Sequence, residues 1–259
     1  MKLTFIGVEG IPMVEPGDDL VALIDEALAA TGEQLLADDV IVIAQKIISK
    51  AEDRYLDLRS VTPTEEAIRL GEEVDKDPRK VQAILDESNE IVRQRPGVLI
   101  VEQRSGFVQA NAGIDQSNIR LGDGDPDDLC LLLPIDSDAS AQRLHTTIRE
   151  RHNLEVGIII NDSLGRAWRM GTLGLAIGVA GFTALEDYIG GHDIFGRELL
   201  VTQVAAADEM AAGASLVMGQ TTEKTPVVIV RGYKPREPQE AHRKGVQPLI
   251  RPKEMDMFR

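Results

Sequence analysis

Short runs of apolar residues recur along the chain and are separated by stretches with a mixed pattern. Val40–Ala44, Val156–Ile160 and Val227–Val230 contain no polar side chain. Runs of this length without alternation are typical of strands that are buried on both faces of a sheet. Shorter stretches that predict strands are Leu3–Val8, Cys130–Leu133 and Leu199–Gln203.

Three longer stretches place apolar residues three and four positions apart, which is the pattern of a helix with one buried face. The first opens at Gly17-Asp18-Asp19 and ends at Gly32, and its apolar face consists of Leu20, Val21, Ile24, Ala27 and Leu28. The other two are Asp138–His152 and the alanine-rich Asp208–Met218. Strands and helices follow one another without an internal repeat or a long linker. We therefore expect a mixed α+β fold.

The stretch from residue 62 to residue 110 predicts helix followed by a hairpin. Thr62–Glu65 is a capping box with proline at the first helical position, and Asp77-Pro78 restarts the helix. We expect this helical region to continue until Gly97. Val98–Gln103 and Phe107–Ala110 then predict two paired strands.

The composition excludes several classes of protein. The chain has 259 residues, of which 43% are hydrophobic, and it is long enough to bury a sizeable core. Cys130 is the only cysteine, which rules out a disulfide framework and a zinc site of paired cysteines. No apolar run approaches the roughly 20 residues that cross a membrane, and the N-terminus has no signal-peptide pattern. We expect a cytoplasmic protein without a membrane partner.

The net charge of −15 argues against nucleic acid as a partner, because a negative field repels a phosphate backbone. Residues 235–259 differ from the rest: six basic and four acidic side chains give them a charge of +2, which leaves −17 for residues 1–234. Four prolines also lie in this stretch. We expect one domain over residues 1–234 and a basic, proline-containing tail over residues 235–259 that wraps its own or a partner subunit.

Asp162 and Ser163 follow the apolar run Val156–Ile160 directly. A carboxylate at the point where a buried strand emerges is a common ligand for Mg²⁺ or Mn²⁺. The alternative is an aspartate that only caps a turn.

Two arginines lie close to this carboxylate in sequence. Arg166 and Arg169 flank Trp168, the only tryptophan, and a pair of guanidinium groups suits phosphate or carboxylate substrates. Four glycines then fall within Gly171–Gly181, where they allow either close packing of the backbone or contact with a ligand.

A second polar segment, Asn111–Asn118, follows the predicted hairpin. Asp115 could share a metal with the first segment, or it could bond its own backbone in a turn. Lys46 and Lys50 are four residues apart, so on a helix they share a face and could approach an anion, although solvated lysines are common. The chain contains neither GxxxxGK[ST] nor GxGxxG, so it has no Walker loop and no Rossmann fingerprint.

Taken together, these segments resemble the coenzyme F420-0:L-glutamate ligase (γ-glutamyl ligase) family over about residues 5–232. The motifs that carry the resemblance are Glu9–Pro12, Gly17–Leu20, Lys46–Glu52, Asn111–Asn118, Leu131–Pro134, Asn161–Arg169, Gly174–Gly181, Asp187–Arg197, Ala207–Glu209, Gly219 and Pro226–Gly232.

The resemblance implies a GTP-dependent ligase that adds L-glutamate to coenzyme F420-0, and to F420-1, through an acyl phosphate. It implies a two-lobed α+β fold with mixed sheets and an intertwined homodimer. Two divalent cations, Mg²⁺ or Mn²⁺, would lie beside the nucleotide, and K⁺ is a further candidate ion. The ligase domain would cover residues 1–234, and the small-molecule partners would be GTP, L-glutamate and the deazaflavin precursor.

The resemblance also assigns residues. Asp115 and Asp162 would bind one metal, and Ser163 and Gln220 would bear on the second. The residues that would surround GTP are Ile11, Pro12, Met13, Val14, Gln45, Lys46, Lys50, Asn118, Gly219, Gln220, Thr221, Thr222, Glu223, Lys224 and Thr225. By position we assign Lys50 to the γ-phosphate and Arg166 and Arg169 to the anionic substrates.

Two other functions remain open at this point. A metal-dependent phosphohydrolase would use Asp115 and Asp162 as a two-metal site on a nucleotide or phosphoester, and would release phosphate without glutamate. A regulatory protein would bind nucleotide without turnover.

Overall fold

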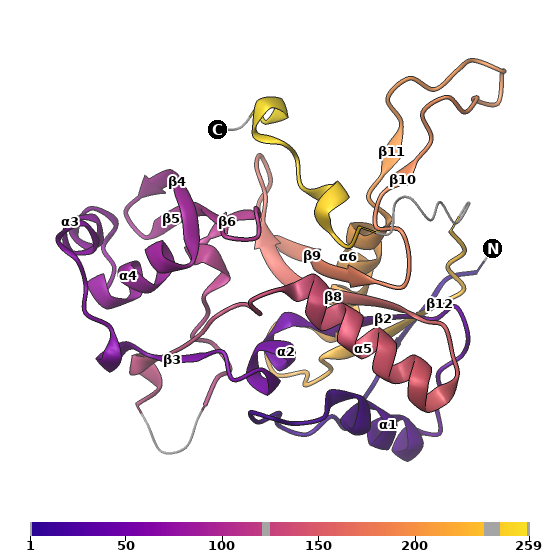
Figure 1. Cartoon of the computed structure of the whole chain (residues 1–259), viewed down its shortest axis with the longest axis horizontal. Helices are drawn as coiled ribbons and strands as arrows, with labels where there is room; N and C mark the ends of the chain where they lie inside the picture. The colour runs from indigo at the N-terminus through magenta and orange to yellow at the C-terminus, as the bar shows by residue number, and fades with distance from the viewer. Residues whose placement is uncertain (1, 121–124, 236–243, 258–259) are drawn as a thin grey trace.

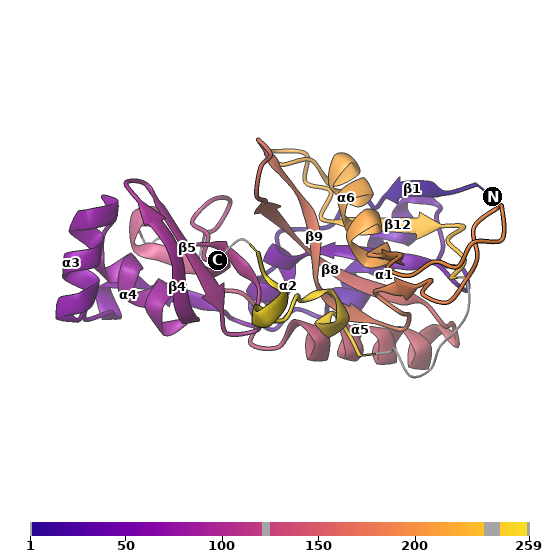
Figure 2. The same cartoon turned by 90° about the horizontal axis from the view of Figure 1, so that it is seen from above.

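The computed structural model describes residues 2–120, 125–235 and 244–257. It has two lobes (Figures 1 and 2). The first lobe contains residues 2–52 and 135–235, and the second contains residues 53–120 and 125–134. The second lobe is therefore an insertion between two parts of the first.

The elements of the first lobe are β1 (Thr4–Gly7), α1 (Leu20–Thr31), β2 (Val40–Ala44), α2 (Gln45–Ala51), α5 (Ser137–His152), β8 (Gly157–Gly165), β9 (Thr172–Ala180), β10 (Glu186–Asp187), β11 (Gln203–Val204), α6 (Ala206–Met218) and β12 (Val227–Arg231). The elements of the second lobe are β3 (Tyr55–Asp57), α3 (Glu65–Val74), α4 (Pro78–Asp86), β4 (Ser88–Arg95), β5 (Val98–Gln103), β6 (Val108–Ala110) and β7 (Leu129–Leu131).

The three apolar runs of the sequence form the centre of the first lobe's sheet, which has the strand order β1-β12-β2-β8-β9. β2 and β8 are parallel, and the other neighbouring strands are antiparallel. Ala44 pairs with Asn161 at the end of the parallel register, so β2 delivers α2 to the edge where β8 carries its polar residues. The predicted mixed α+β fold is confirmed.

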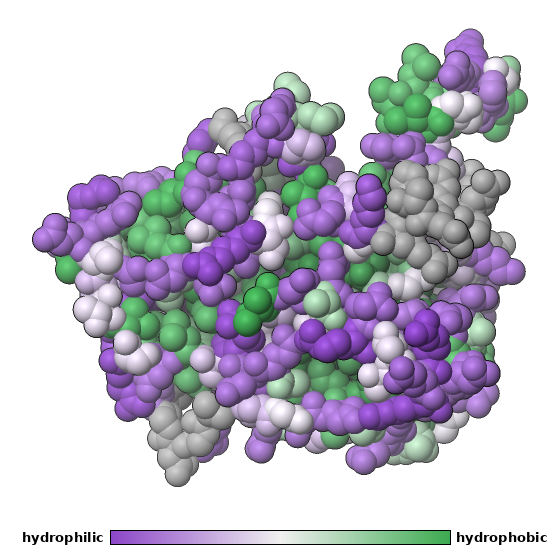
Figure 3. All heavy atoms as spheres, viewed as in Figure 1, coloured by the Kyte–Doolittle hydropathy of each residue, from purple (hydrophilic) through white to green (hydrophobic). Residues whose placement is uncertain are grey.

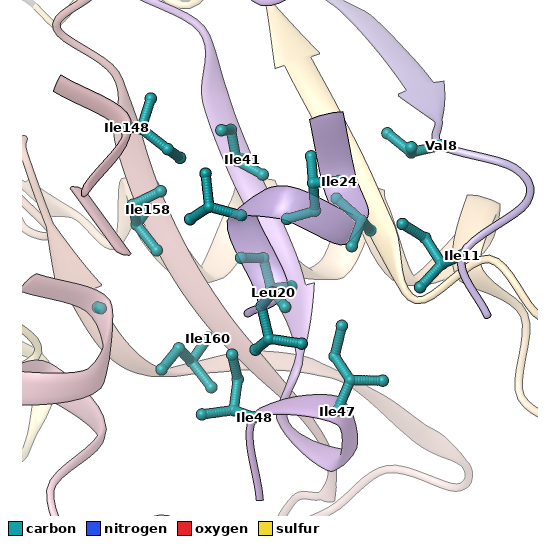
Figure 4. Packing of buried hydrophobic residues seen from close by; sticks show 14 of the residues in the cluster. Val8, Ile11, Leu20, Ile24, Ile41, Ile47, Ile48, Ile148, Ile158 and Ile160 are labelled. Atoms are coloured by element: carbon teal, nitrogen blue, oxygen red, sulfur yellow. The ribbon is translucent and has the colours of Figure 1, made fainter. Parts of the chain in front are cut away.

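Helices cover both faces of this sheet. Ile41 and Ile43 point toward α1 and α5, whereas Val40 and Val42 point toward α6 (Figure 4 shows the first of these two cores). Because successive side chains of a strand enter opposite faces, a sheet covered on both sides needs apolar residues at every position. Asp19 caps α1 by accepting from the backbone N–H of Val21 and Ala22, both at 3.1 Å, as the sequence predicts.

The second lobe is smaller. Its sheet has the order β4-β5-β6, all antiparallel, and α3 and α4 pack against it. The chain enters and leaves this lobe through β3 and β7, which pair with each other. Cys130 on β7 is buried in the core of this lobe.

The prediction of helix as far as Gly97 is wrong. α4 ends at Asp86, and Ser88–Arg95 is the strand β4, which pairs with β5. None of its eight residues is fully buried, so the strand lacks the apolar alternation by which a half-buried strand is recognised.

Three further stretches differ from the sequence prediction. Leu199–Gln203 is not a strand, since only Gln203 and Val204 pair, in β11. The run Val156–Ile160 continues as β8 to Gly165, so Asp162 and Ser163 lie within a strand and not after one. The unpredicted strand β9 contains most of the glycine-rich stretch.

Close packing accounts for the glycines of β9. A Cβ on Gly174 would lie 2.1 Å from the Ser215 hydroxyl oxygen, and one on Gly178 would lie 2.4 Å from the Ser137 carbonyl oxygen. β9 therefore fits between α6 on one face and the start of α5 on the other only where side chains are absent.

The C-terminal segment, residues 244–257, packs on both lobes of its own chain. The Val246 N–H donates to both carboxylate oxygens of Asp138 in α5, at 3.0 and 3.1 Å. Lys253 pairs with Glu90 (3.1 Å) and Glu102 (3.2 Å) of the second lobe. The segment lies between the lobes in Figure 1.

Residues 188–202 form an arm that projects beyond the body at β10 and β11 (Figures 1 and 3). Its exposed large apolar side chains are Ile189, Ile194, Phe195, Leu200 and Val201. Among the described helices, none has the length and apolar character that a membrane crossing requires.

Candidate active site

A cavity of about 520 Å³ lies where the lobes meet. The first lobe lines it with the segment after β1, the start of α2, the polar part of β8 and the loop between α6 and β12, and the second lobe adds the turn after Asp115. The lining residues are Ile11–Val14, Ala44–Ile47, Lys50, Asp115, Ser117–Arg120, Asn161–Ser163 and Met218–Pro226. Every residue that the sequence analysis assigned to GTP or to a metal is among them.

The two lysines of α2 face the cavity and reach the second lobe. Lys46 Nζ donates to Asp115 Oδ2 at 2.8 Å and to the Ser117 carbonyl oxygen at 2.7 Å. Lys50 Nζ donates to the Asn118 carbonyl oxygen at 3.0 Å. The sequence prediction that the pair shares one helical face is confirmed.

Lys50 is buried, with 5% of its surface exposed. Burial, and secondly the charge of Lys46, lower its pKa below the usual value for lysine. Burying the charged ammonium group costs free energy, and a bound anion offsets that cost by pairing with the charge. The position therefore suits a phosphate group.

Asp162 is half-buried on β8, and removal from water raises its pKa to about 6. The Ser163 N–H donates to Asp162 Oδ1 at 2.8 Å and opposes this shift, while the charge of Asp115 adds to it. Ser163 Oγ donates to Gln220 Oε1 at 3.0 Å, which joins β8 to the loop after α6. A cation at this point would relieve the cost of ionising Asp162.

Asp115 forms an isolated bridge with Leu131, and the turn predicted from its sequence is present, while its role as a metal ligand stays a prediction. Its Oδ1 accepts from the Ser117 N–H at 2.7 Å, as in a turn, and its Oδ2 faces Lys46. Burial would raise the pKa of this carboxyl, but the hydrogen bonds from Lys46 and Ser117 bring it below the usual value. The Asp115 carboxylate is therefore ionised, and it is a candidate metal ligand.

The backbone before this aspartate is held in an uncommon conformation. Asn111, Ala112 and Gly113 have φ angles of 55°, 54° and 73°, all in the left-handed region. An alanine there costs on the order of 1–2 kcal/mol, which the surrounding packing must offset. Ala112 is 1% exposed and contributes to the core of the second lobe, so packing fixes the turn that presents Asp115.

The loop after α6 also lines the cavity. It begins at Gly219, with φ of 71°, and the Glu223 carboxylate accepts from the Thr221 N–H at 2.8 Å. Asn118 Nδ2 donates to the Thr221 carbonyl oxygen at 3.1 Å, which ties the second lobe to this loop.

The groups at the cavity that could donate an oxygen ligand to a metal are the carboxylates of Asp115 and Asp162, the Ser163 hydroxyl and the Gln220 amide oxygen. In the part of the chain that the structure describes, no cluster of three or more His, Cys, Asp or Glu side chains could hold a metal. Mg²⁺ is commonly bound by one or two carboxylates together with substrate phosphates and water. Asp115, Asp162, Ser163 and Gln220 therefore fit a hard divalent cation that binds along with a phosphate-bearing substrate.

Arg166 and Arg169 do not line this cavity. They lie in the turn between β8 and β9, both exposed, and Arg166 Nη1 donates to the Gly171 carbonyl oxygen at 3.0 Å. Their assignment to anionic substrates stays a prediction.

Sequence reasoning missed some of the lining, above all Asn161. It is buried, and its Nδ2 donates to Ser215 Oγ at 3.1 Å. The signal that could have found it is its place between an apolar run and Asp162, since a polar residue that ends a buried run must face a polar partner.

A model of the F420-0:gamma-glutamyl ligase family matches residues 10–232. The chain belongs to this family, which confirms the resemblance seen in the motifs.

Three relatives that match along their whole length are each named coenzyme F420:L-glutamate ligase. The protein from Methanothermobacter thermautotrophicus is 47% identical over 261 residues, which cover 100% of both chains. The protein from Methanocaldococcus jannaschii is 43% identical, with 100% of this chain and 97% of the relative covered. The protein from Methanopyrus kandleri is 42% identical, with 99% of each covered.

Proposed function

We propose that this protein is a coenzyme F420:L-glutamate ligase that uses GTP, releases GDP, and couples L-glutamate to coenzyme F420-0 and then to F420-1. The observation that carries the proposal is the convergence of Lys46, Lys50, Asp115 and Asp162 on one cavity. All four lie within the region that matches the family, and relatives named for this activity align along the whole chain.

The nucleotide would occupy the cavity, whose volume of about 520 Å³ is within the range of small-molecule sites. Lys46 and Lys50 would bind the phosphates, because both place a positively charged ammonium group at the cavity of a protein whose net charge is negative. Ile11–Val14, Gln45, Asn118 and the loop Gly219–Thr225 would surround the rest of GTP.

Asp115 and Asp162, with Ser163 and Gln220, would hold Mg²⁺ or Mn²⁺. The cations, when bound, neutralise charge on the phosphate oxygens, which is worth several kcal/mol in such reactions. K⁺ remains a candidate ion for which we assign no residue.

The reaction we propose has two displacements. The carboxylate of F420-0 attacks the γ-phosphorus of GTP, and the bond to the β-phosphate oxygen breaks to give an acyl phosphate and GDP. The amine of glutamate, after losing a proton, then attacks the acyl carbon, and inorganic phosphate leaves as the amide forms. Lys50 would hold the γ-phosphate oxygens throughout as a fixed positive charge.

Water has to be kept from the acyl phosphate, because water would convert the ligase into a phosphatase. The hydrogen bond from Asn118 to the Thr221 carbonyl oxygen links the two lobes at the cavity. A metal-dependent phosphohydrolase, by contrast, must admit water to the same phosphate.

The test is to incubate the protein with GTP, Mg²⁺ or Mn²⁺, F420-0 and glutamate, and to follow phosphate release and product mass. We expect release that depends on both F420-0 and glutamate, with a product heavier by one glutamyl residue. Phosphate released without glutamate would support the phosphohydrolase, and nucleotide binding without release would support a regulatory protein. Replacing GTP by ATP tests the choice of nucleotide.

We also propose a homodimer, in which the arm of residues 188–202 packs on the partner. Five large apolar side chains are exposed on this short segment, and an exposed cluster of this kind marks an interaction surface. Light scattering should give twice 28.3 kDa, and Phe195→Glu should shift the protein toward the monomer. A wild-type particle of 28.3 kDa at micromolar concentration would contradict the proposal.

A further inference from the structure

The turn between β8 and β9, residues 166–171, is here called the hairpin tip. Trp168 is 86% exposed and Met170 is 96% exposed on this turn, beside the exposed Arg166 and Arg169. Trp168 also has a φ of 63°, in the left-handed region that a bulky residue rarely adopts. Conformations of this kind cost on the order of 1–3 kcal/mol and gather at ligand sites.

The hairpin tip continues the strand that carries Asp162 and Ser163. Asp162 pairs with Leu175 and Gly165 pairs with Thr172, so the two strands stay together up to the turn. A strand rises about 3.3 Å per residue, which puts the tip roughly 10 Å or more beyond Asp162. In Figures 1 and 2 this turn projects past the sheet on the side of the second lobe.

The side chains of the hairpin tip are chemically suited to a ligand that has both an aromatic ring and an anionic group. An indole and a thioether offer flat, polarizable surface to an aromatic ring, and a guanidinium binds phosphate or carboxylate with directed N–H groups. Arg166 already closes the turn through the Gly171 carbonyl, so Arg169 is the residue we assign to the anion. The combination fits a planar fused-ring molecule that carries an anionic chain.

We propose that the hairpin tip binds the acceptor substrate: Trp168 stacks on its fused aromatic ring, and Arg169 pairs with an anionic group between that ring and the reacting carboxylate. The inference rests on the proposed ligase function. The cavity is of a size that one nucleotide fills, so the ring of the acceptor has to lie outside it while its carboxylate reaches in. The tip and Asp162 belong to one hairpin, which fixes the separation of the ring from the reacting end.

Steady-state kinetics with F420-0 and GTP test this. Trp168→Ala should raise KM for F420-0 about tenfold or more, since stacking on an aromatic side chain is commonly worth that much, and should leave KM for GTP within twofold. Trp168→Phe should retain most of the affinity. Arg169→Ala should raise KM for F420-0 at low salt, and Arg169→Lys should restore part of it.

Ile68→Ala provides a matched control, because Ile68 is a large apolar residue that is 44% exposed on α3, away from the hairpin. It should leave both KM values unchanged. The same titrations monitored by tryptophan emission report on Trp168 alone, the only tryptophan. We expect F420-0 to change the emission and GTP to leave it unchanged.

Three results would overturn the inference. One is an unchanged KM for F420-0 in Trp168→Ala. Another is an equal rise of both KM values, which would indicate a structural defect. The third is a shift of Trp168→Ala from dimer to monomer in light scattering, which would make the tip a contact between copies of the chain. The activity of the wild-type protein is measured before any variant is compared. If it forms no glutamyl product, the proposed function itself is wrong.

Discussion

The sheets of the two lobes are buried to different extents. In β2 of the first lobe, Ile41, Val42 and Ile43 all have 0% exposure, because the strand lies between two cores. In β4 of the second lobe no residue is fully buried, and only alternate positions of β5, such as Leu99 and Val101, enter the core there. The sheet of the first lobe is thus covered by apolar side chains on both faces, whereas the sheet of the second lobe is only partly covered.

This difference extends to the site. The first lobe presents Lys46, Lys50 and Asp162 from a helix and a strand, whereas the second lobe presents Asp115 from a left-handed turn. Bonds between the lobes complete the cavity, among them the 2.8 Å pair of Lys46 with Asp115. Catalysis should therefore depend on both lobes, while stability should depend mainly on the first.

Asp162→Asn should have the largest effect. The amide keeps the shape but removes the charge that attracts a cation, so we expect ligase turnover to fall about a hundredfold or more, which is ~2.7 kcal/mol of lost transition-state stabilisation. The measurement is turnover at saturating GTP and low Mg²⁺. Excess Mn²⁺ should restore part of the rate.

Asp208→Asn is the matched control for this substitution. Burial raises the pKa of Asp208 as well, and its Oδ1 accepts from the Ala176 N–H at 3.0 Å, but it does not line the cavity. We expect near-normal turnover for it. Turnover of Asp162→Asn within threefold of wild type would remove the metal assignment from β8.

Gly174→Ala should destabilise the first lobe by about 1–3 kcal/mol, the range that added atoms cost in a packed interior. The new methyl would meet the Ser215 hydroxyl and the Ala211 carbonyl oxygen. Urea unfolding measures the loss. Gly165→Ala, on the same hairpin but with nothing within 4 Å, should change stability little; equal losses would show that β9 is not tightly packed.

The stability of the ligand-free protein should depend on the protonation of Asp162. Since burial raises its pKa to about 6, the folded chain retains between about pH 4 and 6 a proton that the unfolded chain has released. The contribution of this group to the free energy of unfolding therefore falls as pH rises through that window, by on the order of 3 kcal/mol.

Comparison with Asp162→Asn isolates this effect from other carboxyls. We expect the variant to gain stability relative to wild type as pH rises from 4 to 7 in urea unfolding without metal. A constant difference over that range would mean that Asp162 titrates like an exposed carboxyl.

Thr64→Ala should have the smallest effect, confined to the second lobe. Thr64 Oγ1 accepts from the Ala67 N–H at 3.2 Å at the start of α3, and loss of such a cap costs about 1 kcal/mol. Hydrogen exchange should quicken in α3 and α4 and stay unchanged in β2 and β8. The capping box predicted over Thr62–Glu65 is wrong, because Thr64 is the N-cap and α3 begins at Glu65. Thr62→Ala should therefore leave exchange as in wild type. Faster exchange in both lobes would show that they unfold as one unit.

The parts of the fold that could be predicted are those whose burial is decided locally. The runs that became β2, β8 and β12 are apolar at every position because both faces are covered, and α1 has its cap and terminal glycine beside it in sequence. β4 could not be predicted, because its identity as a strand comes from pairing with β5. β9 could not be predicted for a related reason. Its glycines are required by close packing against α6 and α5, which lie far away in sequence.

The residues assigned to GTP and to metals followed from the family motifs, and all of them line the cavity, whereas other lining residues such as Asn161 were missed. Their electrostatics did not follow. The pKa of Asp162 is raised while that of Asp115 is lowered, although both are aspartates in polar motifs. Burial raises the pKa of Asp162, whereas hydrogen bonds from Lys46 and Ser117 outweigh burial at Asp115. The pairing of Lys46 with Asp115 depends on how the lobes meet.

The C-terminal segment has a mechanical consequence. The covalent chain crosses between the lobes twice, through β3 and β7, and two adjacent crossings act as an axis about which one body can rock against the other. Residues 244–257 add a noncovalent connection away from that axis, with Val246 on Asp138 at one end and Lys253 on Glu90 and Glu102 at the other. Together with the bonds between the lobes at the cavity, this segment opposes rotation of one lobe about the axis.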